Sequence, residues 1–139
     1  PTGRSSHRDG PGALAAYRRS LAIREALAAR EPANTEWQRD LSVSHNKIGN
    51  VLIAQGDGPG ALAAFRKSLA LGEALAARDP LNAEWQRDLI VSLVKLGEST
   101  GDAIYTARAL RVAQEMQRRG ILAPRDAWMV DELKRRAGQ

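Results

Sequence analysis

His7 and His45 are the only histidines in the 139-residue chain, so they are the first candidates for metal binding or acid–base catalysis. His7 lies in a polar N-terminal stretch, and no histidine, cysteine or carboxylate pair stands at ligand spacing beside His45. The chain contains no cysteine, which excludes a disulfide scaffold and a thiolate metal site. We therefore expect no metal and no cofactor.

Three further patterns suggest chemistry but fit a structural role better. Residues 9–12 and 57–60 read Asp-Gly-Pro-Gly, yet a phosphate-binding loop needs Lys-Ser/Thr at the helix start, and Ala-Leu follows here. No serine stands at a suggestive spacing from a histidine and an aspartate. Asp131 and Glu132 are adjacent on an expected helix and point in different directions. The sequence therefore predicts a protein that is not an enzyme.

The charge distribution argues against nucleic acid as a partner. The net charge is +5 and the isoelectric point is about 10.2, which invites that interpretation. However, residues 1–20 carry +3, residues 21–100 carry −1 and residues 101–139 carry +3, so the body of the chain is balanced. A basic nucleic-acid-binding module remains a minor alternative. The 17 Arg, 4 Lys and 24 Ala indicate a GC-rich, bacterial genome.

Composition favours a globular helical protein away from membranes. Hydrophobic residues make up 43 % and charged residues 27 % of the chain, and aromatic residues only 4 %. Alanine and leucine dominate the apolar residues, which favours helices over strands. No apolar run approaches the roughly 20 residues that span a bilayer, and no secretory signal opens the sequence. We expect a cytoplasmic protein.

The sequence contains an internal repeat. Residues 9–49 align with residues 57–97 at an offset of 48, and 30 of the 41 aligned positions are identical. After residue 97 the similarity decays, so a degenerate third unit is expected from about residue 98. We predict a flexible segment over 1–8 and one helical repeat domain over 9–139. The degenerate last unit fits such a domain, because a repeat array needs an atypical last element as a cap.

Apolar spacing and punctuation by proline and glycine predict antiparallel helices. Pro11 and Pro59 suit first helical turns. Asn34 or Thr35 is the expected N-cap of the second helix. The expected helices are 11–30, 35–55, 59–78, 83–99, 103–119 and a capping helix 124–136. The residues expected in the core are Leu41, Ile48, Leu62, Phe65, Leu69, Leu89 and Leu96.

The repeat resembles a tetratricopeptide repeat. The resemblance rests on Asn-Lys-Ile-Gly-Asn-Val-Leu at 46–52, Gly56-Asp57, and Ala-Leu-Ala-Ala-Phe-Arg-Lys-Ser-Leu-Ala at 61–70. Residues 20–25 are similar to the longer repeats of kinesin light chains and bacterial signalling proteins. The period of 48 departs from the usual 34. The resemblance implies a right-handed superhelical solenoid of antiparallel helices, with Gly49 where two helices cross closely. It also implies a scaffold that binds a protein or peptide, as a module of a larger bacterial signalling or regulatory protein.

One helix face is the candidate partner-binding groove. Val43, Asn46, Asn50 and Ile53 lie about 140–220° away from core-facing Ile48, on the inward face of such an array. Apolar residues on this face suggest a covering partner, and asparagine can bond a peptide backbone. Alternatively, neighbouring helices cover the face. The complete set of groove residues is Val43, Asn46, Lys47, Asn50, Ile53, Val91, Val94, Lys95 and Glu98.

A second candidate surface lies at the N-terminal edge. The repeat begins with the second helix of a unit, so Leu14, Tyr17 and Leu21 lack the helix that covers their counterparts. Further repeats upstream, or association of two chains through this edge, would bury them. Self-assembly, with a homodimer as its simplest form, is therefore the alternative function.

Overall fold

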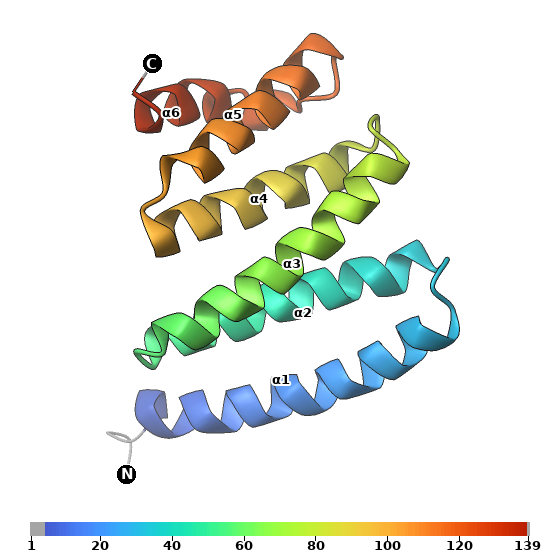
Figure 1. Cartoon of the computed structure of the whole chain (residues 1–139), viewed down its shortest axis with the longest axis vertical. Helices are drawn as coiled ribbons and strands as arrows, with labels where there is room; N and C mark the ends of the chain where they lie inside the picture. Colours follow the sequence, from blue (N-terminus) through green and yellow to red (C-terminus); the bar gives the residue numbers. More distant parts are fainter. Residues whose placement is uncertain (1–4, 139) are drawn as a thin grey trace. The chain divides into compact units, whose positions relative to one another are not determined.

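The protein is all-α. The computed structural model describes the backbone of residues 5–138 and the side chains of residues 12–138, and no β-strand occurs in this part of the chain. None of the helices described here is both long and apolar enough to cross a membrane. The elements, drawn in Figure 1, are α1 Ser5–Arg30, α2 Thr35–Ala54, α3 Gly58–Arg78, α4 Ala83–Thr100, α5 Ala103–Arg118, the short 3-10 helix η2 Pro124–Asp126, and α6 Trp128–Arg136.

The chain forms two compact units that meet within α3. The first unit comprises residues 1–71, with α1, α2 and the larger part of α3. The second unit comprises residues 72–139, with the end of α3, then α4, α5, η2 and α6. Each unit has buried side chains of its own, so each is described by itself.

Side-chain caps set the helix starts, and the repeat is visible in them. The side chain of Asn34 accepts a hydrogen bond of 3.0 Å from the backbone N–H of Trp37, and Asn82 does the same for Trp85. Each asparagine satisfies one of the N–H groups that a helix start leaves without a partner. The predicted start of α2 is confirmed, with Asn34 rather than Thr35 as the cap.

Two predicted boundaries differ from the structure. Helix α1 begins at Ser5 rather than at residue 11, so Pro11 is an interior helical residue and Ser5–Arg8 belong to a helix. A proline inside a helix removes one backbone hydrogen bond and crowds the preceding turn, which weakens the helix without excluding it, so Pro11 alone does not mark a start. The predicted capping helix 124–136 divides into η2 and α6, with Ala127 between them. His7 lies outside the part of the chain whose side chains are described.

In the first unit α2 crosses α3 closely. A Cβ atom added at Gly49 would lie 2.4 Å from the ring of Phe65, so only glycine fits at this crossing. Phe65 is 1 % exposed. The Ser42 hydroxyl lies 3.0 Å from that of Ser68 and donates to the Ser68 carbonyl at 3.1 Å, so polar contacts link the same two helices.

In the second unit α4 packs against α5 and the end of α3. Gln86 donates from Nε2 to the carbonyl of Ala76 at 3.1 Å and so holds the end of α3 beside α4. Gly97 again stands at a tight position, because a Cβ there would lie 3.1 Å from Oγ1 of Thr106. The buried apolar residues of α4 and α5 are Leu89, Ile90, Leu93, Leu96, Ala109, Leu110, Ala113 and Met116.

The predicted core is confirmed at six of seven positions. Leu62 is the exception, since it is only half-buried while Phe65 on the same helix is buried. Leu62 lies about 60° from Phe65 around the helix, which turns it toward the margin of the packed face. The six confirmed residues are Leu41, Ile48, Phe65, Leu69, Leu89 and Leu96.

Replacement of Phe65 by alanine should destabilise the protein strongly. We expect the free energy of unfolding to fall by about 3–5 kcal/mol, because a buried ring is lost and a cavity is left. Urea unfolding followed by circular dichroism measures this change. Ile23→Ala is the control, since Ile23 is 64 % exposed and its loss should change stability by less than about 0.5 kcal/mol. Equal midpoints for both variants would contradict the prediction.

Candidate functional site

A groove of about 260 Å³ lies between α4 and α6 in the second unit. We call it the α4–α6 groove. From α4 it is lined by Arg87, Ile90, Val91, Val94, Lys95 and Glu98, and from α6 by Trp128, Met129, Glu132, Leu133 and Arg136.

The α4–α6 groove has an apolar floor and one large exposed ring. Ile90, Met129 and Leu133 are buried and form the floor, while Val94 is half-buried beside them. Trp128 lines the same groove but is 60 % exposed. A large exposed aromatic side chain next to a buried apolar floor marks a surface suited to another molecule.

Two ion pairs hold η2 and α6 against α4. Near the start of α4, Arg87 donates from Nε to Oδ2 of Asp126 at 3.0 Å and from Nη2 to Oδ1 at 3.4 Å. Near the end of α4, Nη1 of Arg136 lies 3.4 Å from Oε2 of Glu98. Because the two pairs join start to start and end to end, the helices run side by side in the same direction.

Most charges of the groove are already neutralised. Glu132 accepts hydrogen bonds from Arg135 and Arg136, and these lower the pKa of Glu132. The hydrogen bond that Arg136 donates to Glu132 in turn raises the pKa of Arg136. Lys95 is half-buried in the groove wall and makes no ion pair with a carboxylate of the described residues. It is therefore the groove cation with charge to offer a partner.

In the second unit the structure brings the predicted groove residues together. Val91, Val94, Lys95 and Glu98 all line the α4–α6 groove. The opposite wall, including Trp128, is absent from the predicted groove, because the pattern of residues 124–136 predicts only a capping helix. The exposed tryptophan in an amphipathic last helix was the available signal. Its pairing with α4 could not be derived from spacing.

In the first unit the predicted residues are divided. Val43 and Lys47 line a pocket of about 260 Å³ between α1 and α2, together with Tyr17 and Asp40. Tyr17 is predicted at the self-association edge, whereas Val43 and Lys47 are predicted in the partner-binding groove. Residues expected on two different surfaces therefore line one pocket. This pocket is more polar than the α4–α6 groove, since Ser20, Arg24 and Ser44 complete its lining.

The remaining three predicted residues of α2 have different surroundings. Oδ1 of Asn46 is buried and has no hydrogen-bond partner. Asn50 and Ile53 are exposed, and Ile53 is 49 % exposed. A buried acceptor without a partner is unfavourable, so an N–H group able to reach Asn46 would stabilise it.

The N-terminal edge is less covered than its counterpart in the repeat. Tyr17 and Leu21 of α1 are half-buried, as is Leu14, whereas Phe65 and Leu69 at the positions equivalent to the first two are buried. Leu14, Tyr17 and Leu21 thus form a partly exposed apolar edge of the first unit.

The described residues contain no group of three histidine, cysteine, aspartate or glutamate side chains that could hold a metal ion. Comparison of the chain with protein-family models, with curated proteins and with solved structures finds no match in any of the three.

Removal of the Asp126 carboxylate should loosen the α4–α6 groove. Asp126 is 4 % exposed and bonds Arg87 through both oxygens, so Asp126→Asn should lower the free energy of unfolding by about 1.5–3 kcal/mol. Glu98→Gln is the matched control at the other end, where the pair is exposed and contributes at most about 1 kcal/mol. Thermal unfolding measures both, and a larger effect of Glu98→Gln would contradict this account of the groove.

Proposed function

We propose that the protein is an interaction module that binds a segment of a partner protein. The observation that carries the proposal is the α4–α6 groove, which combines a buried apolar floor with the exposed ring of Trp128. An apolar side chain of the partner would enter the groove. Lys95 at the wall would pair with a carboxylate near that side chain.

The make-up of the groove favours a protein partner. Its volume is about 260 Å³, and its apolar floor lies beside the exposed ring of Trp128. Such a space suits one or two anchoring side chains of a longer segment. Tryptophan is enriched among the residues that dominate protein–protein binding energies, which gives Trp128 the central role in the proposal.

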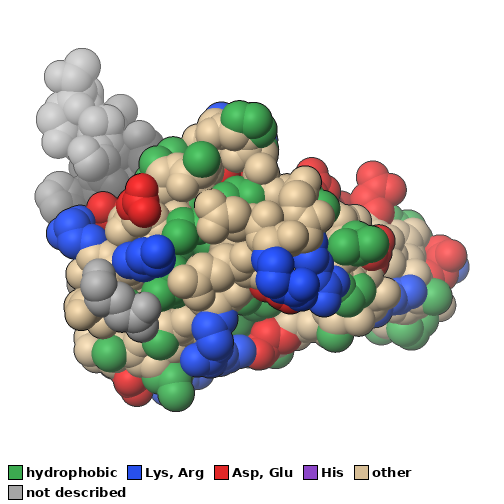
Figure 2. All heavy atoms as spheres, turned by 90° about the horizontal axis from the view of Figure 1, so that it is seen from above, with side chains coloured by type: hydrophobic (Ala, Val, Ile, Leu, Met, Phe, Trp, Pro, Cys, Tyr) green, Lys and Arg blue, Asp and Glu red, His purple; other side chains and the backbone are tan. Residues whose placement is uncertain are grey.

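The sequence repeat supports the same proposal. Its resemblance to tetratricopeptide repeats implies a superhelical binding scaffold within a larger bacterial protein of the cytoplasm. On the face shown in Figure 2, Lys and Arg side chains are interspersed with acidic and apolar ones. A mixed surface of this kind suits a protein partner better than a phosphate backbone, which would require a basic patch.

Selection from a random peptide library displayed on phage tests the proposal. Peptides are selected on the wild-type chain and then tested for binding to Val94→Lys, which places a charge in the groove. We expect recovered peptides to share an apolar residue close to an acidic one. Their binding should weaken little with salt, because an apolar anchor releases few counterions. Peptides that bind Val94→Lys equally well would overturn the assignment of the groove. A steep loss of affinity with salt would instead favour the nucleic-acid alternative.

Trp128→Ala should weaken the binding of a selected peptide by about thirtyfold, the effect of removing a residue worth about 2 kcal/mol. The fold should survive, because Trp128 is largely exposed. Isothermal titration calorimetry measures the affinity. Leu81→Ala is the matched control, since Leu81 is also 60 % exposed but does not line the groove. Equal losses in the two variants would contradict a specific role for Trp128.

Self-assembly is the second candidate, and the half-buried edge formed by Leu14, Tyr17 and Leu21 favours it. If two chains pair through this edge, sedimentation velocity should show a dimer whose fraction rises with concentration. Tyr17→Glu should abolish that dimer, because the association would bury an unpaired charge. Ile23→Glu, on the exposed part of the same helix, should have less effect. A single monomeric species at every concentration would remove this candidate.

A further inference from the structure

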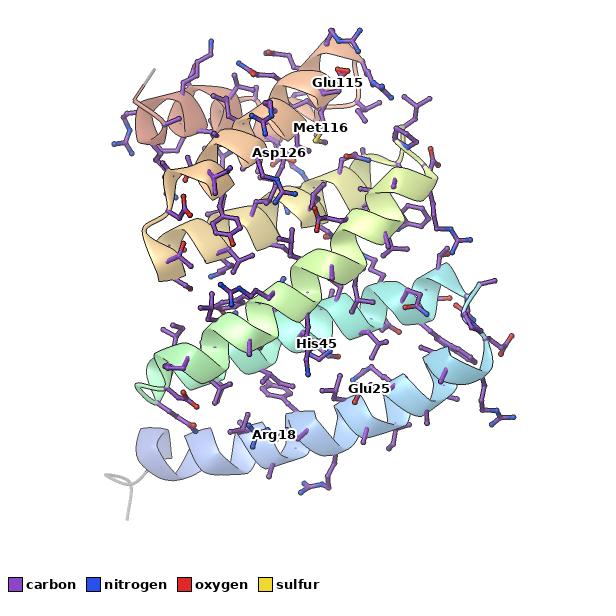
Figure 3. All side chains as sticks on the ribbon, viewed as in Figure 1. Arg18, Glu25, His45, Glu115, Met116 and Asp126 are labelled. Atoms are coloured by element: carbon purple, nitrogen blue, oxygen red, sulfur yellow. The ribbon has the colours of Figure 1, made fainter. Side chains whose placement is uncertain are left out.

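A further cavity, of about 280 Å³, lies among α1, α2 and α3 of the first unit. We call it the His45 cavity. Its apolar wall includes Leu21, Ile48 and Leu52, while Arg18 of α1 and Lys67 of α3 also line it. Figure 3 shows His45 in the space between α1 and α3, with Arg18 and Glu25 on the facing stretch of α1.

Packing alone does not require a histidine at this place. The repeat puts Leu93 at the equivalent position in the second unit, where it is completely buried. His45 is 6 % exposed, so a polar ring is buried in α2 at the position where the equivalent helix α4 carries leucine. Buried polar groups are normally hydrogen-bonded, which makes this exchange unfavourable unless the ring has a partner.

The ring nitrogens of His45 make no hydrogen bond to the described part of the protein. His45 lines the cavity, so a molecule bound there can reach the ring. A neutral imidazole presents one N–H donor and one acceptor. The donor is therefore available to a molecule in the cavity.

Two cations flank this ring without a carboxylate of their own. Arg18 and Lys67 are exposed, and neither forms an ion pair with a described residue. Burial lowers the pKa of His45, the nearby charge of Lys67 lowers it further, and Glu25 raises it in part. The cavity is thus positive at its edge, neutral at the imidazole and apolar along its wall.

We propose that the His45 cavity binds a carboxylate carried on a short aliphatic chain. The carboxylate would accept hydrogen bonds from Arg18, Lys67 and the imidazole, while the aliphatic part would lie against Leu21, Ile48 and Leu52. Inorganic phosphate fits less well, because the apolar wall would replace water around it without offering donors. A free aliphatic carboxylate and a glutamate side chain of a partner protein share this chemistry.

Binding should depend on pH in a defined direction. The groups facing the ring are Arg18 and Glu25 from α1 and Lys67 from α3. A bound carboxylate favours the imidazolium form and raises the pKa of His45, so binding takes up a proton. Affinity should therefore rise as the pH falls from 8 to 6, a range in which the carboxylate itself stays ionised.

Nuclear magnetic resonance of the full chain, with labelled histidine, tests the proposal. Hexanoate and the peptide acetyl-Leu-Glu-Leu-amide are the probes, and hexanol is the uncharged control. We expect hexanoate to shift the His45 ring signals in a saturable way, and to bind more tightly at pH 6 than at pH 8. Hexanol should shift these signals little. A response to the peptide as well identifies a partner side chain as the source. A response to hexanoate alone identifies a free carboxylate.

Variants separate the cavity from a general charge effect. Arg18→Gln and Lys67→Gln should each weaken hexanoate binding about tenfold, the loss of one charge-assisted hydrogen bond. Arg19→Gln is the matched control, because Arg19 is an exposed neighbour on α1 that does not line the cavity. His45→Leu copies the second unit and should fold normally by circular dichroism, yet lose the pH dependence of binding followed by backbone amide signals.

Three results would overturn the proposal. These are His45 signals that neither carboxylate moves, hexanol that binds as tightly as hexanoate, and an Arg18→Gln variant that retains wild-type affinity. None of them bears on the α4–α6 groove, because all the residues concerned belong to the first unit. The peptide-binding function and the carboxylate site can therefore fail independently.

Discussion

The close crossing of α2 and α3 is the constraint on which the first unit depends. Any side chain at position 49 would overlap the ring of Phe65, so the two helices can approach only because this residue is glycine. The approach seals Phe65 from solvent and lets Ile48 and Leu52 close the apolar wall. The second unit repeats the arrangement with Gly97, where a side chain would meet Thr106. Both candidate sites are built on helices held in this way.

The two copies of the repeat share this frame but differ in chemistry within one turn of the helix. The positions concerned are close together in sequence, so they lie on neighbouring faces of α2 and of α4. The first copy is polar there and the second is apolar. Ser42, His45 and Asn46 of the first copy stand at the positions of Ile90, Leu93 and Val94 of the second. The apolar version supplies the floor and wall of the α4–α6 groove, and the polar version supplies the imidazole of the His45 cavity.

The sequence predicted the helices well because their boundaries depend on local chemistry. Asn82 caps α4 by accepting a hydrogen bond from the backbone N–H of Trp85, three residues further along the chain. Gly101 ends the same helix in a left-handed conformation. The predicted start of α1 was wrong because Pro11, although unfavourable inside a helix, does not end the helix on its N-terminal side. The α4–α6 groove was predicted only on the α4 side. Its other wall depends on Arg87 meeting Asp126, 39 residues away, and no periodic pattern records such a pair.

The division of chemistry between the copies follows from how a repeat is stabilised. Each repeat contacts mainly its neighbours, so a substitution is tolerated when the adjoining helix of the same unit accommodates it. Ser42 bonds Ser68 within the first unit, whereas Ile90 at the equivalent place is buried among apolar residues of the second. One copy can therefore acquire a polar cavity while the other keeps an apolar groove. A buried polar side chain introduced in this way needs a hydrogen-bond partner, either inside its own unit or from a ligand. His45 has none among the described protein groups, whereas Ser42 has one, and this difference distinguishes a candidate binding residue from a packing residue.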